Sequence, residues 1–384
     1  MTDTGITIVG AGVVGLAVAA RLAPTHPDLM VLERRPRHGM ETSSRNSQVI
    51  HAGIYYPPGS LKARLCREGR ERLYAICAAH DLPHRRLGKL VTAATPADLP
   101  ALDLVAASAA ANDVPLRRLT AEEAHALEPR VASAGALYSE SSGIVDAHSL
   151  MDYLLAAALA AGATLYPEAR VEALERVPGG WRLDVSRGGE TESLTTERVV
   201  NSAGLEADTV AALAGIDVDA AGYRLHWCKG SYFSASTRCA ALASRLVYPV
   251  PAPESLGVHV VLDTGGRMRF GPDAEFLPER VEDYRVDPRK RAAFGEAARR
   301  LLPDVRDEDL EPDICGIRPK LQAPGGPVRD FVIADETSRG LPGLYNLIGI
   351  ESPGLTAAPA IAEYVAERRS AGVPPATVGR LVRR

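Results

Sequence analysis

A glycine-rich turn near the N-terminus has the residue types and spacing of a phosphate-binding junction. The sequence GAGVVG at 10–15 stands between an apolar run and a run of small residues. This pattern predicts a strand, a turn and a helix: Gly10 allows the turn, Gly12 lets the backbone approach a pyrophosphate, and Gly15 lets the helix pack on the strand. A second apolar run ends in Glu33, at the spacing of an acid that binds ribose hydroxyls. The junction therefore predicts a dinucleotide site.

A polar segment at 42–62, TSSRNSQVIHAGIYYPPGSLK, is the next candidate for chemistry. The hydroxyls, amide and guanidinium of its first half suit a helix start near phosphates. Its second half sets a single histidine, His51, among aromatic and glycine residues. A lone histidine is more often a packed core group than a catalyst, but these polar surroundings favour a functional role. Arg34, directly after Glu33, lies either near the adenine ribose or in a solvated cluster that neutralises Glu33.

Two further strand-to-helix junctions are rich in small residues. The sequence VVNSAG at 199–204 predicts a turn at Ala203 and Gly204 that brings the backbone toward the cofactor. The sequence GIESPGLTAAP at 349–359 follows a predicted strand at 345–348 and precedes a helix expected at about 360–366. Glycines at such a junction aim backbone donors at an electron-rich group. We therefore expect both ends of the chain to form one discontinuous nucleotide domain.

Composition excludes several classes of function. A formal net charge of −4 over 384 residues, without a sustained basic face, argues against a nucleic-acid-binding protein. Five scattered cysteines without a Cys-x-x-Cys pair fit reduced thiols in a cytoplasmic protein. Neither a signal peptide nor an integral membrane segment is expected, so membrane contact would be peripheral. Pro83 interrupts the pair His80 and His84, and we predict no metal site.

The remaining pattern predicts elements around these motifs. Helices are expected at 62–79 and at 287–302, and Asp146 is the expected N-cap of a helix that ends near 161. Strands near 164–166, 170–174 and 181–185 are expected to form a meander. The region from 222 to about 310 has apolar alternation bounded by glycine and proline, which indicates antiparallel hairpins.

Three motifs in order carry a resemblance to a known family: the 42–56 segment, GIRPK at 316–320 and GIESPGLT at 349–356. From residue 6 to about 366 the chain resembles the FAD-dependent oxidoreductases of the D-amino-acid oxidase superfamily, and within it the L-2-hydroxyglutarate oxidase or dehydrogenase group. The resemblance implies an α/β fold, a glutathione-reductase-type FAD-binding Rossmann domain with an inserted, mainly antiparallel α+β substrate domain. The FAD-binding parts are expected at 1–85, 143–220 and 313–384, and the substrate-domain parts at 86–142 and 221–312.

The resemblance also implies how FAD is held. Glycines and an acid would bind the ADP half, the polar segment would follow the pyrophosphate and ribityl chain, and the C-terminal junction would face the flavin N1/O2 edge. The residues that it implies are Gly10, Gly12, Gly15, Glu33, Arg34, Ser43, Ser44, Arg45, Asn46, Ala203, Gly204, Gly354, Leu355 and Thr356. In related amine dehydrogenases a histidine at a position resembling His51 is bonded covalently to the flavin, and that link stays open here.

The implied reaction is oxidation of a 2-hydroxy acid, L-2-hydroxyglutarate to 2-oxoglutarate, by hydride transfer to flavin N5. Arg318, in the superfamily's Gly-x-Arg-Pro motif, would grip the substrate carboxylate with its planar fork. A histidine suits the base for the hydroxyl proton, and His259, on a strand expected to cover the flavin, is favoured over His51. Candidates for the second carboxylate are Lys229, Lys320 and Arg45. Tyr56 and Tyr232 would supply hydrogen bonds or an apolar wall.

Several alternatives stay open at this point. An amine or amino-acid oxidase could use the same scaffold without a strong base. An NAD-dependent dehydrogenase could use the turn at 10–15, although the junction at 349–356 would then have no role. A flavin-binding protein without catalysis would leave Arg318 and Lys320 without a purpose. The chain is shorter than many hydroxyglutarate enzymes between Gly271 and Leu310, which leaves the substrate open, and the electron acceptor is either oxygen or a quinone.

Overall fold

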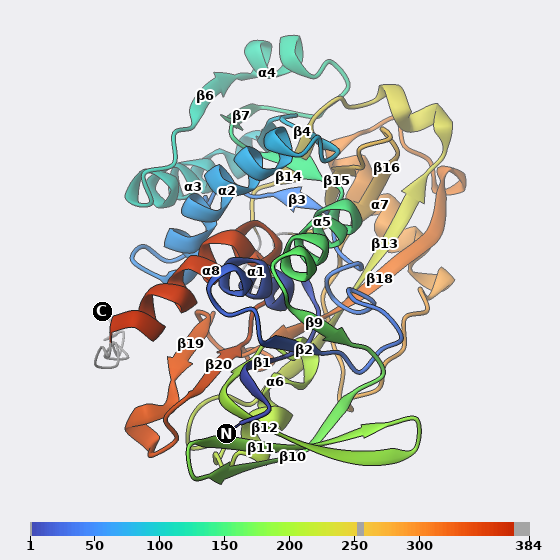
Figure 1. The fold of residues 1–384 in the computed structure, drawn as a ribbon. Coiled ribbons are helices and arrows are strands. Elements are labelled where there is room, and N and C mark those ends of the chain that lie inside the picture. The colour runs from blue at the N-terminus through green and yellow to red at the C-terminus, as the bar shows by residue number, and fades with distance from the viewer. Residues whose placement is uncertain (1, 252–256, 372–384) are drawn as a thin grey trace.

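The computed structural model describes residues 2–251 and 257–371 and arranges them around two large sheets and a small one (Figure 1). The first sheet has a parallel centre in the order β9-β2-β1-β12-β20. Its strands are β1 (Thr4–Val9), β2 (Leu29–Leu32), β9 (Thr164–Tyr166), β12 (Glu190–Asn201) and β20 (Leu344–Ile348). Every residue of β1 is buried, as expected of a central parallel strand with both faces covered.

Antiparallel strands extend this sheet at two places. The edge strand β19 (Val332–Asp335) pairs with β20. The hairpin β10 (Arg170–Val177) and β11 (Gly180–Arg187) pairs with the first half of β12 and projects at the bottom of Figure 1. Buried and more exposed residues alternate along β11, so one face of the hairpin packs on the core and the other meets water.

Helices cover both faces of the first sheet. On one face lie α1 (Val13–Leu22), α5 (Ala147–Ala160), α8 (Gly354–Ala371) and α2 (Leu61–Ala79), which share a hydrophobic core with Ile6 and Ile8 of β1. Figure 1 shows the N-terminal helix α1 beside the C-terminal helix α8. On the other face α6 (Ala207–Leu213) packs on Val9 and Val199. Both ends of the described chain therefore build one α/β unit.

The second sheet is mainly antiparallel and extends across the upper part of Figure 1, from β6 and β7 to β16 and β13 at the right. Its order is β17-β13-β16-β15-β14-β5-β7-β6, with β18 paired to β13. The strands are β5 (Lys89–Ala93), β6 (Arg117–Thr120), β7 (Gly135–Ser139), β13 (His226–Ala235), β14 (Leu246–Pro249), β15 (His259–Leu262), β16 (Met268–Gly271), β17 (Glu275–Phe276) and β18 (Leu310–Lys320). The helix α7 (Arg291–Leu301) packs on this sheet through Phe294 and Ala298.

Shorter elements complete the fold. The helices α3 (Leu99–Ala111) and α4 (Ala121–Leu127) accompany β5, β6 and β7. The small sheet has the order β3-β8-β4, from β3 (Val49–Ile50), β4 (His84–Arg85) and β8 (Gly143–Val145). Short 3-10 helices lie at Ala23–Thr25, Pro96–Asp98, Gly204–Glu206, Thr237–Ala241, Pro288–Lys290, Asp307–Asp309 and Glu336–Arg339. Within the described residues, no helix has the length and apolar character needed to cross a bilayer.

Most expected elements are confirmed. Asp146 caps α5, where its Oδ1 accepts a hydrogen bond from the Ser149 N–H at 2.7 Å. Two expectations are wrong. The strand 164–166 does not join the meander, because β9 pairs in parallel with β2 and only β10, β11 and β12 form antiparallel neighbours. The last helix starts at Gly354 rather than near Ala360, and it continues through Pro359.

The expected division into domains stays a prediction. Its limit between 312 and 313 falls within β18. This strand pairs with β13 from Leu310 to Lys320, so residues 313–320 lie in the second sheet. Arg318 and Lys320 therefore lie on the sheet that was expected to cover the cofactor.

Candidate active site

The first junction lies at the carboxyl end of β1, where Gly10 turns the chain toward α1. Gly10 has a φ of +100°, and a Cβ there would lie 2.6 Å from the carbonyl oxygen of Ser202. A Cβ on Gly15 would lie 2.0 Å from the carbonyl oxygen of Gly10, so the helix packs too closely for any side chain. Gly12 is the N-cap residue of α1, and a Cβ there would lie 3.0 Å from Ser43 Oγ. The turn and the close packing that the spacing predicted are therefore present.

The carboxylate of Glu33 is held at the same turn. Its Oε2 accepts a hydrogen bond from the Ala11 N–H at 2.9 Å, and its Oε1 accepts one from the Arg35 N–H at 2.8 Å. Burial raises the pKa of Glu33, and the two backbone N–H groups offset part of that rise. The residue lines a cavity together with Gly10, Gly12, Ala203 and Gly204. Its remaining lone pairs are available to donors such as hydroxyl groups.

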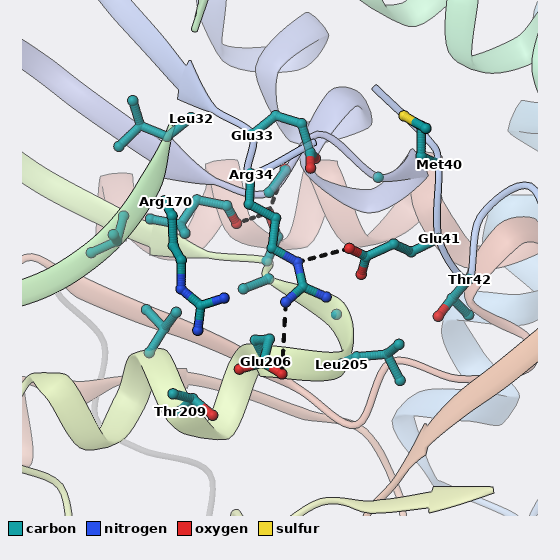
Figure 2. Close-up of a pocket in the computed structure, with 18 of the residues that line it drawn as sticks. Leu32, Glu33, Arg34, Met40, Glu41, Thr42, Arg170, Leu205, Glu206 and Thr209 are labelled. Carbon is teal, nitrogen blue, oxygen red and sulfur yellow. Dashed lines mark hydrogen bonds and ion pairs between the residues drawn. The ribbon is translucent and has the colours of Figure 1, made fainter. Parts of the chain in front are cut away.

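Arg34 lies at the edge of this first cavity (Figure 2). Its Nε donates to Glu41 Oε1 at 2.7 Å, its Nη2 donates to Glu282 Oε1 at 2.7 Å, and its Nη1 lies 3.8 Å from Glu206 Oε1. Burial opposes the charge of Arg34, but the Glu41 carboxylate outweighs it and raises the pKa of the guanidinium. A cluster of charges is therefore present around Arg34, formed by Glu41, Glu206 and Glu282, and the charge of Arg34 also counteracts the rise in the pKa of Glu33. A place for Arg34 near the adenine ribose stays a prediction.

The polar segment runs from the first cavity to a larger one. Ser43 Oγ accepts a hydrogen bond from the Val13 N–H at the start of α1, at 3.0 Å. Asn46 Nδ2 donates to the Ser43 carbonyl at 2.7 Å, while Ser44 Oγ donates to the Glu41 carbonyl at 3.1 Å. Ser43, Arg45 and Asn46 line the larger cavity, whereas Ser44 lines neither. The hydroxyl of Ser44 therefore contacts its own loop, and the expected part of Ser44 in cofactor binding stays a prediction.

The second junction follows β20 and opens α8. Gly354 and Leu355 line the larger cavity. Thr356 does not: its Oγ1 accepts from the His51 N–H at 3.0 Å and donates to the Val49 carbonyl at 3.2 Å. The hydroxyl of Thr356 therefore ties β3 to α8 and sets the position of His51. The N–H of Gly354 donates to the Glu351 carbonyl at 2.5 Å. The next N–H groups of a helix start lack intrahelical partners, so at this junction the N–H of Leu355 is the donor that remains for the cavity.

The larger cavity has a volume of about 610 Å³ and is lined by residues from both large sheets. Its wall contains most of the side chains that the sequence nominated for substrate chemistry: His51, Tyr56, Tyr232, His259, Arg318, Lys320 and Arg45. Lys229 is the exception, because it does not line the cavity and its Nζ lies 3.4 Å from Asp283 Oδ2. Successive residues of a strand face opposite sides, and on β13 it is the neighbour Gly230 that faces the cavity.

Arg318 is fixed in the wall by backbone carbonyls. Its Nη2 donates to the carbonyls of Asp273 at 2.6 Å and Lys229 at 3.0 Å, and its Nε donates to the carbonyl of Cys228 at 3.3 Å. A Cβ on Gly230 would lie 3.0 Å from Nη2, so the glycine makes room for the guanidinium. Among the described residues Nη1 has no partner. The arrangement holds the charged fork rigid and leaves one amino group for an anion.

His259 is buried in the wall of the cavity with a defined tautomer. Its Nδ1 lies 2.8 Å from the Gly257 carbonyl, which can only accept, so Nδ1 carries the hydrogen and Nε2 carries a lone pair. Burial lowers the pKa of His259 to about 3, and the charges of Lys89 and Arg318 act in the same direction. The imidazole stacks on Tyr248 with ring centroids 3.7 Å apart. His259 is therefore a neutral, oriented acceptor.

His51 lines the same cavity, and both its ring and its backbone contact the segment that opens α8. Its Nε2 is 3.4 Å from Ser352 Oγ, and its backbone is tied to α8 through Thr356. Burial lowers the pKa of His51 well below its usual value, and Lys89 and His259 add to this effect. Both histidines are neutral near pH 7, and either could accept a proton.

Lys320 belongs to a cluster of three charged side chains, and the sequence did not reveal the other two members. Glu351 accepts from Lys62 Nζ at 3.0 Å and lies 3.1 Å from Lys320 Nζ, and all three side chains line the cavity. Burial alone would raise the pKa of Glu351, but Lys62 and Lys320 hold it below its usual value. The group carries one net positive charge. Glu351 stands inside the C-terminal motif and Lys62 ends the polar segment, yet neither type nor spacing signals their pairing.

Two tyrosines of the wall also escaped the sequence analysis. Tyr55 and Tyr248 line the cavity, and within the part of the chain that the structure describes their hydroxyls have no hydrogen-bond partner. The nominated tyrosines differ, because Tyr56 has a side-chain hydrogen bond with Ser352 and Tyr232 has one with Ser47. Tyr55 and Tyr56 are adjacent in a turn after β3 and both line the cavity, so no sequence pattern could have separated the two.

Comparison with known proteins places these observations in a family. Residues 5–368 match the family described as FAD dependent oxidoreductase. The chain belongs to this FAD-dependent oxidoreductase family. Its relatives include the mitochondrial L-2-hydroxyglutarate dehydrogenase of Arabidopsis thaliana, 40% identical over 94% of this chain and 82% of the plant protein. They also include the L-2-hydroxyglutarate dehydrogenase of Escherichia coli, 26% identical over 94% of this chain and 92% of the bacterial one.

A solved structure of the family supports the fold. L-alpha-glycerophosphate oxidase from Mycoplasma pneumoniae, with FAD bound, superposes with a TM-score of 0.84 at 24% identity, over 96% of this chain and 94% of the other. The expected fold class is thereby confirmed: an FAD-binding Rossmann-type sheet combined with a mainly antiparallel one. The family match shows that the cofactor is FAD, which excludes the NAD-dependent alternative.

Proposed function

We propose that this flavoenzyme oxidises L-2-hydroxyglutarate to 2-oxoglutarate. The observation that carries the proposal is the guanidinium of Arg318, anchored by three carbonyls in the cavity wall with Nη1 left for a carboxylate. A neutral histidine with a free Nε2 faces the same cavity. The names of the plant and bacterial relatives supply the substrate.

FAD fits the residues that surround the two cavities. At the first junction the Cβ positions of Gly10 and Gly15 are blocked by backbone atoms, and Arg45 Nε is buried in the larger cavity without a partner among the described residues. We assign the ADP half to Gly10, Gly12 and Glu33, with Ala203 and Gly204 beside them. The polar segment around Ser43, Arg45 and Asn46 follows the pyrophosphate and ribityl chain, and the start of α8 at Gly354 and Leu355 faces the flavin ring.

Each residue then has a defined task in the reaction. Arg318 binds the C1 carboxylate and fixes the orientation of C2. His259 Nε2 accepts the proton of the 2-hydroxyl, which it can do because burial keeps the imidazole neutral. An anionic substrate offsets the charge of Arg318 and thereby raises the pKa of His259 toward the range of a useful base. Bound FAD supplies the acceptor for the hydride of C2.

His51 is the alternative base, and it is also the candidate for a covalent link to the flavin. The two roles are separable by experiment. Acid precipitation releases a non-covalently bound flavin into the supernatant and leaves a covalent one in the pellet. The variants His51→Ala and His259→Ala then identify the base, because the loss of the base lowers the rate of flavin reduction at saturating substrate.

The decisive experiment is an anaerobic titration of the purified holoenzyme with L-2-hydroxyglutarate. The proposal expects the flavin absorbance to bleach with the L enantiomer, and 2-oxoglutarate to form in equal amount. Failure of L-2-hydroxyglutarate to bleach the flavin would exclude the proposed substrate. Oxygen and a quinone analogue, added separately to the reduced enzyme, then identify the electron acceptor, which we propose to be one of these two.

The amine or amino-acid oxidase remains the alternative on this scaffold, and a panel of amino acids in the same titration tests it. A flavin that bleaches with an amino acid but with no hydroxy acid would favour that alternative. We propose a cytoplasmic location for this chain, whereas the plant relative is described as mitochondrial. Cell fractionation tests the proposed location. Recovery of the protein in washed membranes would indicate peripheral attachment.

A further inference from the structure

Two tyrosine hydroxyls in the cavity wall have no hydrogen-bond partner in the part of the chain that the structure describes. Tyr248, on β14, is 1% exposed and lines the cavity, and Tyr55 follows β3 and lines it too. Within the described residues neither hydroxyl has a hydrogen-bond partner. Burial raises the pKa of both phenols, so each keeps its proton and remains a donor. A buried hydroxyl without a partner costs free energy, which a ligand with acceptor oxygens would recover.

A buried lysine lies behind these two rings. Lys89, on β5 beside β14, is 1% exposed, and its Nζ lies 3.9 Å from the ring centroid of Tyr248 and 5.8 Å from that of Tyr55. His259 stacks 3.7 Å from the same Tyr248 centroid, so the ammonium and the imidazole occupy opposite faces of that ring. Two other titratable groups interact electrostatically with Lys89: Cys66 affects the pKa of Lys89, and Lys89 lowers the pKa of His51.

Among the described residues, Lys89 differs from the other buried lysines because its ammonium group has no carboxylate partner. Lys229 lies near Asp283, and Lys62 shares Glu351 with Lys320. Lys89 makes no ion pair with any described acid. A buried cation that lacks an anion is unstable unless a ligand brings one. The cation–π contact with Tyr248 compensates for only part of the lost hydration.

These observations converge on an anion. We propose, on the basis of the proposed function, that Tyr55 and Tyr248 donate hydrogen bonds to the distal carboxylate of the substrate, with the ammonium of Lys89 behind their rings as its counter-charge. Arg318 takes the carboxylate next to the reacting carbon, and this second subsite selects a dicarboxylate over a monocarboxylate of equal length. Lys89 is not part of the cavity wall, so it acts through its charge and is a positioning residue.

The proposal replaces the candidates that the sequence offered for the second carboxylate. Lys229 faces away from the cavity, and the charge of Lys320 is already half neutralised by Glu351. Arg45 has a free Nε, but it stands in the polar segment assigned to FAD and stacks on Tyr284 at 4.2 Å. The tyrosine pair is the set of unpaired donors with a cation behind it.

Substrate discrimination tests the tyrosines. We compare kcat/KM for L-2-hydroxyglutarate and for L-2-hydroxypentanoate, which has the same chain without the second carboxylate. Tyr55→Phe and Tyr248→Phe should each lower the preference for the dicarboxylate about 10-fold, as expected for the loss of a hydrogen bond to a charged group, and leave the pentanoate rate within about 2-fold. Tyr284→Phe is the matched control, because its hydroxyl is also buried and unpaired but Tyr284 does not line the cavity. An unchanged preference in the double variant would overturn the proposal.

Proton uptake tests Lys89 without any turnover. Burial lowers the pKa of Lys89 to about 7, so at pH 8 most of the side chains are neutral before a ligand binds. Calorimetric titration of the oxidised holoenzyme with glutarate, in buffers of different ionisation enthalpy, should show uptake that approaches one proton per glutarate. Pentanoate should cause almost none, and Lys89→Met should abolish the uptake. Uptake that persists in Lys89→Met, or none in the unsubstituted enzyme, would overturn the role of Lys89. Because glutarate cannot be oxidised at C2, this result stands whether or not the proposed reaction is correct.

Discussion

Replacement of Lys89 by methionine should stabilise the protein at pH 6, although the change removes a charged side chain that we assign to substrate binding. Burial lowers the pKa of Lys89 from 10.5 to about 7, which corresponds to at most about 5 kcal/mol of cost for keeping the charge in the folded state. The variant also loses the favourable cation–π contact between Lys89 and Tyr248, which reduces the gain in stability by about 1–2 kcal/mol. The expected net gain in the free energy of unfolding of Lys89→Met is therefore about 3 kcal/mol at pH 6.

The sign of the pH dependence follows from proton counting. Below pH 7 the lysine is protonated in both the folded and the unfolded state, so its full cost is present. Between pH 7 and about 10 the unfolded chain still binds the proton and the folded protein does not, so the stability of the unsubstituted protein rises with pH. The advantage of Lys89→Met should therefore shrink steadily as the pH is raised.

The assay is urea unfolding of the holoenzymes at pH 6, 7.5 and 9, followed by circular dichroism and by flavin fluorescence. Lys62→Met is the matched control, because it removes another buried lysine but leaves Glu351 with one cation fewer. This control should lose stability at all three pH values. A Lys89→Met variant that is less stable than the unsubstituted protein at pH 6, or an advantage that stays constant up to pH 9, would refute the reasoning.

Three further predictions concern the first glycine junction and the cavity wall. Arg318→Lys keeps the charge but loses the planar fork and its carbonyl anchors, so kcat/KM should fall about 100-fold while flavin content is unchanged, as steady-state kinetics and the absorbance ratio will show. Gly15→Ala places a Cβ 2.0 Å from the Gly10 carbonyl, so we expect loss of bound FAD and a lower melting temperature, and a fully loaded variant would contradict this packing. Below pH 6.5 both His51 and His259 become protonated in the unfolded chain. In the folded protein burial keeps both neutral at this pH, and His259 stays neutral down to about pH 3. Stability should therefore fall with acidity by up to about 1.4 kcal/mol per pH unit for each histidine, and His259→Gln should reduce that slope in acid unfolding curves.

The parts of the site that the sequence predicted are those set by local structure. Gly10 and Gly15 are constrained by a turn and by one helix-strand contact, so their types alone indicate the junction. The cap at Asp146 depends on one hydrogen bond from the Ser149 N–H, three residues later at the start of the same helix. Such features need no knowledge of distant partners. Arg318 was nominated by a motif, and strand pairing then showed that it belongs to the second sheet.

The parts that the sequence missed depend on which strands become neighbours. Lys89 and Tyr248 meet because β5 and β14 pair in parallel, although more than 150 residues separate them, and no periodicity within either strand indicates that register. Lys229 was nominated by charge, but one residue along β13 decides whether a side chain faces the cavity or Asp283. The strand β9 was assigned to a meander for the same reason, because its true partner, β2, lies far away in the sequence.

The pairing of Lys320 with Glu351 joins the cofactor site to the substrate site. Glu351 stands in the loop between β20 and α8, on the first sheet, and Lys320 ends β18, on the second. A buried ion pair of this kind contributes less to stability than to geometry, because the cost of desolvation offsets much of the attraction. Its geometric effect is to fix the end of β18, two residues after Arg318, against the loop that precedes α8. Under the proposed assignment, in which Arg318 binds the substrate carboxylate and the start of α8 faces the flavin, one contact between the sheets sets the position of both.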